Sequence, residues 1–590
     1  MDPRRLLAIA TGTLLAATYV ACSSTDDAAS KASAATTGAT GTTTTATGSG
    51  GAGGSGGGPG GSGGVTAEDA GAPDAAPDAA AIDTTICDAM GLAPRPFAAG
   101  PYGPHRGDLA DDFTIDLADG STYAFQQGFT GCELHVFVPD TLVVSDQDAT
   151  SIWEADLDKL LKASPKNVHY VFISRQKTDA AAKKSTDAMV ARVDALLAKL
   201  AKGDADHWRA RVHVAAPRAG ALGNWVGDVI SGSGRIGFVI DRDQRVRGMG
   251  MLADVKRYDQ ALADAKAWPW KSNLAYAANE AVYWNAQADQ QAKLDADGAT
   301  IVPVFEGETL AEFAEKDVAL PSAAELAKFD TLEVEVTSAC PNPDEIEFGN
   351  CGAWDYIASL GVFDANQKNV EVARFITSYH RETHWVVDAS AMLVQLASGG
   401  TRHFRWDFAP SWNTQPTATK LALRFSNRKK AVRPSAATFL WSGGGFGAAY
   451  NDAHPPVTVD IPAGAKKVEL FAIITGHGAG TGQCSEFCNH QHEFTVNGTV
   501  HLKDHKVAGS SDKCMPEMKH GMVPNQGGTW WFGRGGWCPG EQVDPWVVDV
   551  TSAVTPGQAA TIAYRGLVVG KPPADGSGDI DMVSYLVVHE

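Results

Sequence analysis

The chain lacks an excess of basic residues, and this limits its partners. Its 69 acidic residues outnumber the 49 lysines and arginines, which gives a formal net charge of -20 at pH 7. Proteins that bind nucleic acid neutralise phosphates with a basic stripe, so no nucleic-acid partner is expected. An apolar run of transmembrane length is lacking as well. The run from Leu6 to Ala21 is shorter than the about 20 residues that a typical spanning helix needs.

Cysteine is scarce, and its spacing argues against the common zinc motifs. The chain has nine cysteines and no C-x-x-C pair, so the case for a zinc site is weak. Setting Cys22 aside leaves an even number, which suggests disulfides in an exported protein. The remaining eight are Cys87, Cys132, Cys340, Cys351, Cys484, Cys488, Cys514 and Cys538.

The N-terminus has the features of an export signal. Two arginines precede the short apolar run, which ends in Val20-Ala21-Cys22. Small residues before a cysteine resemble a bacterial lipobox, although Tyr19 stands where leucine is usual. We expect residues 1–22 to be a lipoprotein signal and Cys22 to carry the lipid. The protein would then be extracytoplasmic, at the cell envelope or surface, and attached to the membrane by this anchor only; simple secretion is the alternative.

Composition divides the rest of the chain into four parts. Residues 23–84 are rich in Ser, Thr, Gly and Ala, which predicts a flexible linker. Residues 85–290 alternate between strand and helix patterns, including a helix over Asp254 to Trp268, and so predict an α/β domain similar to thioredoxin or peroxiredoxin. Residues 296–430 and 431–590 contain short strands between Gly and Pro turns, which predicts two all-β sandwiches.

The thioredoxin-like domain lacks the residue on which the redox chemistry of that fold depends. A low-pKa cysteine should end the first core strand and open a helix. The chain has Pro139-Asp140-Thr141 at that place, and Cys132 precedes the strand instead. We expect a structural disulfide between Cys132 and Cys87, and an accessory or binding role for the domain.

A polar loop between two cysteines precedes the first candidate catalytic carboxylate. Cys340 and Cys351 bracket this loop, and Trp354 and Asp355 follow directly. A disulfide here would hold the loop and preorganise Asp355, as general acid or base catalysis requires. The alternative is an aspartate that caps a turn or pairs with an arginine.

A second carboxylate lies between Cys484 and Cys488. In an extended strand these two cysteines would lie about 13 Å apart, whereas a disulfide needs Cα atoms within about 7 Å. A bridged segment must therefore turn back on itself and present Glu486 at the apex of a small ring. Such a carboxylate is either a functional acid or an incidental exposed residue.

Aromatic residues surround a glycine-rich loop near the C-terminus. The loop from Gly533 to Gly540 contains Arg534 and Trp537, and Trp530 and Trp531 precede it. Tryptophan rings are natural platforms for sugar faces, and an arginine in such a loop can approach a polar ligand. The alternative is a turn that packs over the edge of the sandwich.

Together these segments resemble the peptide-N-glycosidase F family, bacterial amidases that cleave between asparagine and the first N-acetylglucosamine. The resemblance runs from about Thr300 to the C-terminus. It is carried by Cys340-Pro-Asn, Cys351 to Tyr356, Ala373 to Thr377, Cys484 to Cys488 and Gly536 to Gly540. It implies two jelly rolls with the site in the cleft between them, so the expected fold is a thioredoxin-like domain followed by two jelly-roll sandwiches. The implied disulfides are Cys340–Cys351, Cys484–Cys488 and Cys514–Cys538.

The resemblance also implies roles for individual residues. Asp355 matches the principal catalytic aspartate, Glu486 the second essential acid and Arg534 an arginine of the cleft. Asp407 stands where the family has a third acid, a glutamate. The implied mechanism needs no metal or other cofactor: Asp355 acts on the amide as base toward water or as proton donor to nitrogen, while Glu486 orients water or holds charge.

The substrate side of the site departs from the family. Tyr356 replaces an arginine, and His477 stands where a substrate-facing tryptophan would be, and these changes affect glycan recognition more than the pair of carboxylates. We expect N-glycosylated proteins or glycopeptides as substrates and a monomeric protein. The residues assigned to substrate binding are Trp354, His477, Trp530, Trp531, Arg534 and Trp537.

Two other functions compete with the amidase. His490 and His492 lie two apart on a predicted strand and so share a face. With Met518 they resemble the copper site of peptide monooxygenases that use the same pair of jelly rolls. A surface lipoprotein that binds glycans without turnover is the other alternative. A requirement for copper would favour the oxygenase, and binding without turnover would favour the lectin.

Overall fold

The computed structural model describes residues 83–140, 151–154, 156–232, 236–253, 273–478 and 484–590. Cys22, nearly all of the expected linker and the helix expected over Asp254 to Trp268 lie outside the described residues. Within the described part of the chain, no helix is both long and apolar enough to cross a membrane. The protein has the four disulfides expected from the sequence: Cys87–Cys132, Cys340–Cys351, Cys484–Cys488 and Cys514–Cys538.

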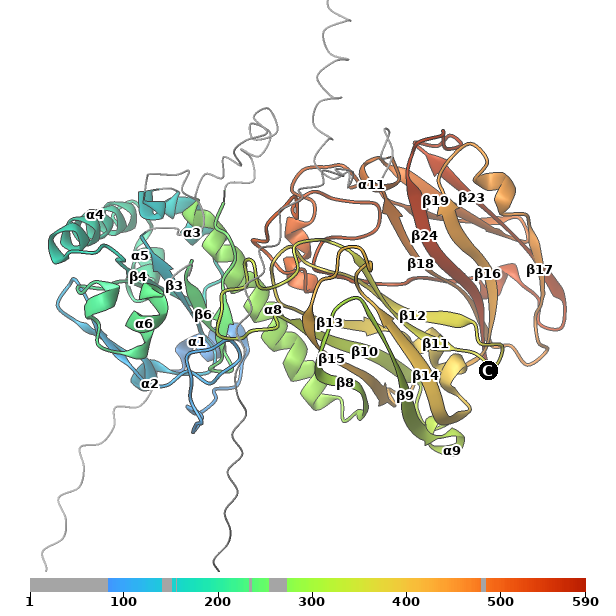
Figure 1. Ribbon diagram of the computed structural model, residues 1–590, viewed down its shortest axis with the longest axis horizontal. Helices are drawn as coiled ribbons and strands as arrows, with labels where there is room; N and C mark the ends of the chain where they lie inside the picture. Colours follow the sequence, from blue (N-terminus) through green and yellow to red (C-terminus); the bar gives the residue numbers. More distant parts are fainter. Residues whose placement is uncertain (1–82, 141–150, 155, 233–235, 254–272, 479–483) are drawn as a thin grey trace, which may run out of the picture. The chain divides into compact units, whose positions relative to one another are not determined.

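The N-terminal part is built on a five-stranded sheet in the order β5-β4-β3-β6-β7 (Figure 1). Strands β3, β4 and β5 are parallel, whereas β6 and β7 add in antiparallel fashion. Val136 and Tyr170 enter one hydrophobic cluster, and the alternate residues Phe137 and Val171 enter another. Because side chains alternate along a strand, the sheet is covered on both faces. The strands are β3 (Leu134–Pro139), β4 (Val168–Ile173), β5 (Val212–Val214), β6 (Phe238–Ile240) and β7 (Val246–Gly248).

A small hairpin and a set of helices complete this part. The helix α4 begins where the Thr178 side chain accepts a hydrogen bond from the Ala181 amide, an N-cap. Helix α8 packs against β3, α3 and the short 3-10 helix η9 (Met515–His520) near the C-terminus. This arrangement of strands and helices agrees with the α/β domain predicted from the sequence, while membership of the thioredoxin family stays a prediction. The elements are α1 (Thr85–Met90), β1 (Thr114–Asp116), β2 (Thr122–Ala124), α2 (Phe125–Gly128), α3 (Leu157–Ala163), α4 (Asp179–Leu197), α5 (Lys202–Arg209), α6 (Trp225–Ser231) and α8 (Ala277–Ala296).

The next part is a sandwich of two antiparallel sheets, ordered β13-β10-β15-β8 and β21-β12-β11-β14-β9. Residues of both sheets, such as Val334, Trp385 and Phe404, share one buried core. The strand β21 (Gln542–Val543) comes from far along the chain and pairs with β12. The other strands are β8 (Thr300–Leu310), β9 (Phe313–Ser322), β10 (Thr331–Ala339), β11 (Ile357–Phe363), β12 (Asn369–Ile376), β13 (Thr383–Asp388), β14 (Gly399–Asp407) and β15 (Thr417–Ser426), with short helices α9 (Ala323–Leu326) and α10 (Leu393–Leu396).

The last part is a second sandwich, with sheets ordered β16-β24-β18-β22 and β17-β23-β19-β20. Figure 1 shows β18, β24 and β16 side by side in one of these sheets. Phe471 of β18 and Tyr585 of β24 belong to the core of the first sandwich, so the two sandwiches share buried surface. The elements are β16 (Pro434–Gly445), β17 (Val457–Asp460), β18 (Lys467–His477), α11 (Cys484–Phe487), β19 (His490–Val496), β20 (Thr499–Asp504), β22 (Trp546–Asp549), β23 (Ala559–Val568) and β24 (Asp579–His589).

Candidate active site

Asp355 lies two residues before β11, in a backbone segment that is held from both sides. The hydroxyl of Thr377 donates to the Trp354 carbonyl at 2.5 Å and accepts from the Tyr356 amide at 2.7 Å. The Thr377 amide also donates to the Tyr356 carbonyl. Because the residues on either side of Asp355 are fixed by Thr377, the position of its Cα is determined by β12, the strand that Thr377 follows.

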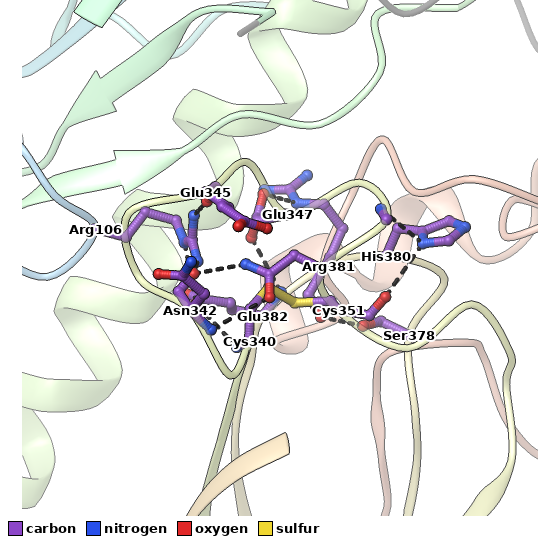
Figure 2. Close-up of a disulfide and its surroundings, with 12 residues drawn as sticks. Arg106, Cys340, Asn342, Glu345, Glu347, Cys351, Ser378, His380, Arg381 and Glu382 are labelled. Atoms are coloured by element: carbon purple, nitrogen blue, oxygen red, sulfur yellow. Dashed lines mark hydrogen bonds and ion pairs between the residues drawn. A yellow bond between two sulfur atoms is a disulfide. The ribbon is translucent and has the colours of Figure 1, made fainter. Parts of the chain in front are cut away.

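The loop before Asp355 is closed by the Cys340–Cys351 disulfide and anchored by charge (Figure 2). Arg381, fully buried, makes an ion pair with Glu347 of this loop at 2.8 Å. Arg106 of the N-terminal part donates to the Asn342 carbonyl at 2.9 Å. The loop is thus held both by its own covalent link and by side chains from other parts of the molecule.

Glu486 is presented by a single helical turn, α11, inside the ring closed by Cys484 and Cys488. The two Cα atoms lie 4.4 Å apart, so the segment turns back as the sequence required. One carboxylate oxygen of Glu486 accepts a hydrogen bond from the Gly478 amide at 2.8 Å. Its side chain is only 8% exposed, so Glu486 faces the interior of the protein.

Arg534 joins the two candidate acids. Its Nε lies 3.0 Å from Oε1 of Glu486, and its Nη2 lies 3.3 Å from Oδ2 of Asp355. The side chain is completely buried, and its other N–H groups donate to Thr529 and Phe532. A buried guanidinium needs such partners, because an unpaired charge in the interior is costly.

The surroundings oppose ionisation of both acids. Burial raises the pKa of Glu486 to about 7, against the effect of Arg534, and the neighbouring Asp355 raises it further. Burial likewise raises the pKa of Asp355 above its ordinary value, although Arg534 and a hydrogen bond with Tyr379 act in the opposite direction. Two carboxyl groups around one cation can hold one proton near neutral pH, which suits acid and base roles in a single reaction.

Comparison with known proteins supports the resemblance seen in the motifs. Residues 446–587, which include Glu486 and Arg534, match the family model described as peptide-N-glycosidase F, C terminal. A curated relative is the peptide-N(4)-(N-acetyl-beta-D-glucosaminyl)asparagine amidase F of Elizabethkingia miricola, 23% identical over 287 residues, which cover 44% of this chain and 73% of that protein. The C-terminal half of the chain resembles peptide-N-glycosidase F.

Solved structures of this family are similar too. One is peptide-N-glycosidase F, a glycosylasparaginase from Flavobacterium meningosepticum, with 18% identity and a TM-score of 0.39 over 50% of this chain and 96% of that chain. Another is PNGF-II, with 15% identity and a TM-score of 0.37 over 58% of this chain and 71% of that chain. The likeness of the N-terminal sheet to thioredoxin stays a prediction.

The tryptophans that were assigned to substrate binding fall into different environments. Trp354 is 42% exposed, beside Asp355. Trp530 and Trp531 are each 2% exposed and belong to a hydrophobic cluster shared with the N-terminal part. Neither of these two rings offers a free face to a sugar, so they contribute packing here, contrary to the expectation from sequence. Hydrophobic burial of a large aromatic side chain gives enough stabilisation to account for their presence.

The Trp537 ring stacks on the His477 ring and lies against Arg534. The Trp537 ring lies 4.8 Å from the Arg534 guanidinium carbon and 4.9 Å from the His477 ring, with 22° between the two rings. The Trp537 indole N–H donates to the Gly476 carbonyl at 2.8 Å. Burial lowers the pKa of His477 to about 3, with help from Arg374 and Arg534, so the imidazole is neutral. The Trp537 ring thus contacts both Arg534 and His477.

Asp407 and Met518 lie in environments other than the expected ones. Asp407 ends β14 and makes an ion pair with Arg405 at 2.8 Å, with its side chain 38% exposed. Met518 lies on η9 in a hydrophobic cluster with residues of α8 such as Ala281. The Asp407 carboxylate is paired with Arg405, and the Met518 thioether is packed among apolar side chains. Neither side chain therefore joins the site to which the sequence assigned it.

Three residues of the site carry no signal that sequence analysis used. Tyr379 and Thr529 hydrogen-bond to Arg534, and the Trp412 ring is 69% exposed. Trp412 lies 6.1 Å from the Tyr356 ring, whose hydroxyl accepts from Asn413 at 2.6 Å. The exposure of Trp412 and the contacts of Tyr379 and Thr529 with Arg534 become visible only when the chain is folded.

Proposed function

We propose that the chain is a peptide-N4-(N-acetyl-beta-glucosaminyl)asparagine amidase that releases N-linked glycans from glycoproteins or glycopeptides. The observation that carries this proposal is the arrangement of Asp355 and Glu486 around one buried arginine, Arg534. The family match over residues 446–587 supports glycoproteins or glycopeptides as the substrate class. Relatives with this name act on the amide between asparagine and N-acetylglucosamine.

The proposed reaction is hydrolysis of an amide. Water adds to the carbonyl carbon of the side-chain amide as a carboxylate of the pair takes its proton. The C–N bond then breaks, and a proton passes from the same carboxyl to the departing nitrogen. The products are aspartate in place of asparagine and a glycosylamine. We assign proton transfer to Asp355, which is the more exposed acid, and placement of the water or of charge to Glu486.

Arg534 has a defined role in this scheme. The single positive charge offsets one ionised carboxylate, while the second carboxyl holds a proton near neutral pH because burial raises its pKa. The site thus carries a base and an acid without a further cation. Trp354 directly precedes Asp355 in the chain, and the Trp412 ring lies 6.1 Å from the Tyr356 ring. Both tryptophan rings are exposed, and we assign them to the sugar.

We also propose that the protein is exported as a monomeric lipoprotein with Cys22 as the lipidated residue. Four disulfides support export, because such bonds persist in oxidising compartments. Mass spectrometry of the N-terminal peptide from membrane fractions tests the lipid at Cys22.

The amidase is tested with the chain purified with its disulfides intact and incubated with a denatured glycoprotein in ¹⁸O-labelled water. We expect asparagine to become aspartate carrying one ¹⁸O, measured by peptide mass spectrometry. Asp355→Asn should reduce the rate by roughly 10²–10⁴-fold. Asp344→Asn, a change in the same disulfide loop at a side chain 64% exposed, should retain the rate. Glycan binding without conversion would contradict the amidase and favour a lectin.

A further inference from the structure

Three histidines meet on one face of the second sandwich. His490 and His492 lie two apart on β19, and their side chains point to the same face. His505 follows β20, and its amide donates to the His490 carbonyl at 3.0 Å, so the two residues are neighbours across the strands. The exposed fractions are 0% for His490, 0% for His492 and 5% for His505.

The three imidazoles converge on a common point. One ring nitrogen from each histidine lies within 4.8 Å of the other two. The ring centroids are 4.7, 5.1 and 5.3 Å apart. Within the part of the chain that the structure describes, the Nε2 atoms of all three are buried and have no hydrogen-bond partner.

Such a set of atoms requires an explanation, since buried polar atoms are almost always paired. His490 Nδ1 lies 3.0 Å from the Cys488 carbonyl and must donate to it, because a carbonyl only accepts. In a neutral imidazole this leaves Nε2 with a free lone pair. His492 Nδ1 is held at 2.7 Å by the Tyr564 hydroxyl. In metal-binding histidines, too, the ring nitrogen that does not bind the ion makes a hydrogen bond, and this bond orients the other nitrogen toward the ion.

We propose that His490, His492 and His505 bind one late first-row transition-metal ion through their Nε2 atoms. Imidazole nitrogen is the ligand type that zinc and copper share. Bonds of about 2.0–2.1 Å place three such nitrogens roughly 3.3–3.6 Å from one another, so small side-chain rotations close the site. Because all three ligands are neutral, Cu⁺ leaves less buried charge than Zn²⁺, and both ions enter the test.

The site lies directly against the loop that carries Arg534. A Cβ at Gly535 would come within 2.4 Å of His490 Cε1, and a Cβ at Gly536 within 2.6 Å of His505 Cε1. The loop therefore rests on the imidazoles, and only glycine permits this approach. Through Cys488, His490 also contacts the ring that presents Glu486. The bound ion thus has a structural role: it fixes β19 and β20 to the two segments that supply Glu486 and Arg534.

The test uses the full chain without a polyhistidine tag, stripped of metal by a chelator. The chain is equilibrated with Zn²⁺, Cu⁺ or Co²⁺, freed of excess ion by gel filtration and analysed by elemental mass spectrometry. We expect about one ion of Zn²⁺ or Cu⁺ per chain, a higher Tm, and visible absorption bands with Co²⁺. A content below about 0.1 ion per chain for all three metals overturns the proposal.

Two variants and a matched control locate the ion. His505→Gln and His490→Gln should each weaken binding by more than the about 10–100-fold that the loss of an outer partner causes. His501→Gln removes a histidine of β20 that lies outside the cluster and should bind as the wild type does. Equal binding in the cluster variants and the control overturns the assignment. Circular dichroism of the metal-free variants checks the fold, and the stoichiometry and Co²⁺ bands of the wild type decide the question if a variant unfolds.

Discussion

At Glu486 the effect of burial on a single carboxyl group gives a prediction about stability. The pKa of Glu486 is raised to about 7, first by burial and then by Asp355, whereas in an unfolded chain it returns to about 4.3. Between these values the folded state binds more protons than the unfolded state, so stability falls as the pH rises. From pH 5 to pH 8 the wild type should lose on the order of 2–3 kcal/mol of unfolding free energy relative to Glu486→Gln.

Urea denaturation at several pH values measures this difference. Glu517→Gln serves as the control, because the Glu517 side chain is 37% exposed on η9; this variant should follow the wild type across the range. A constant difference between wild type and Glu486→Gln from pH 5 to pH 8 would mean that Glu486 is ionised throughout.

Glu486 and its neighbours in the site show what the sequence can and cannot predict. Asp355 and Glu486 each lie beside a cysteine pair whose short spacing fixes their local geometry, so both were identified from local motifs. The spatial link between them is Arg534, which is 48 residues from Glu486 and 179 from Asp355 in the chain. Trp530 and Trp531 were misassigned because an aromatic pair in a loop has the same pattern whether it faces a sugar or a hydrophobic core.

At the scale of elements, β18 shows why strands were predicted more readily than their partners. Its residues from Val468 to Thr475 are all buried, which reads as a strand covered on two faces. Val468, Leu470 and Ala472 enter the core of the second sandwich, while Phe471 enters that of the first. The apolar run predicts that both faces of β18 are buried, but it does not predict that the first sandwich covers one of these faces. The same holds for β21, which crosses to pair with β12.

This arrangement predicts the effect of a single core substitution. Phe471 is 1% exposed, and Phe471→Ala should lower the unfolding free energy by about 3–5 kcal/mol, because it leaves a cavity where the sandwiches meet. Val547→Ala, on the neighbouring strand in register with Phe471 and 46% exposed, is the matched control; its cost should stay below about 1 kcal/mol. Urea denaturation followed by tryptophan fluorescence measures both. Similar losses in the two variants would show that the sandwiches do not share this core.

At the scale of the whole molecule, the N-terminal part contacts the candidate site through a buried ionic network. Glu280 of α8 binds Arg381 at 3.0 Å, and Arg381 in turn binds Glu347 in the disulfide loop before Asp355. The side chains of Glu280 and Arg381 are 0% and 2% exposed. The accessory or binding role expected from the sequence stays a prediction, and these contacts connect the N-terminal part to the loop that leads to Asp355.

Glu280→Gln tests this role, because it removes the charge while it keeps the size of the side chain. Loss of one partner from a buried ion pair costs about 3–5 kcal/mol, and the freed loop should lower the amidase kcat by at least about 10-fold, since small displacements at a reacting group are costly. Glu315→Gln removes a carboxylate that is 35% exposed and paired with Arg405, so it should have little effect on stability and leave kcat unchanged. If Glu280→Gln lowers stability but retains the wild-type kcat, the N-terminal part stabilises the fold without positioning Asp355. If both quantities fall together, the α/β part belongs to the catalytic unit, and an isolated β-sandwich half should be a poor amidase.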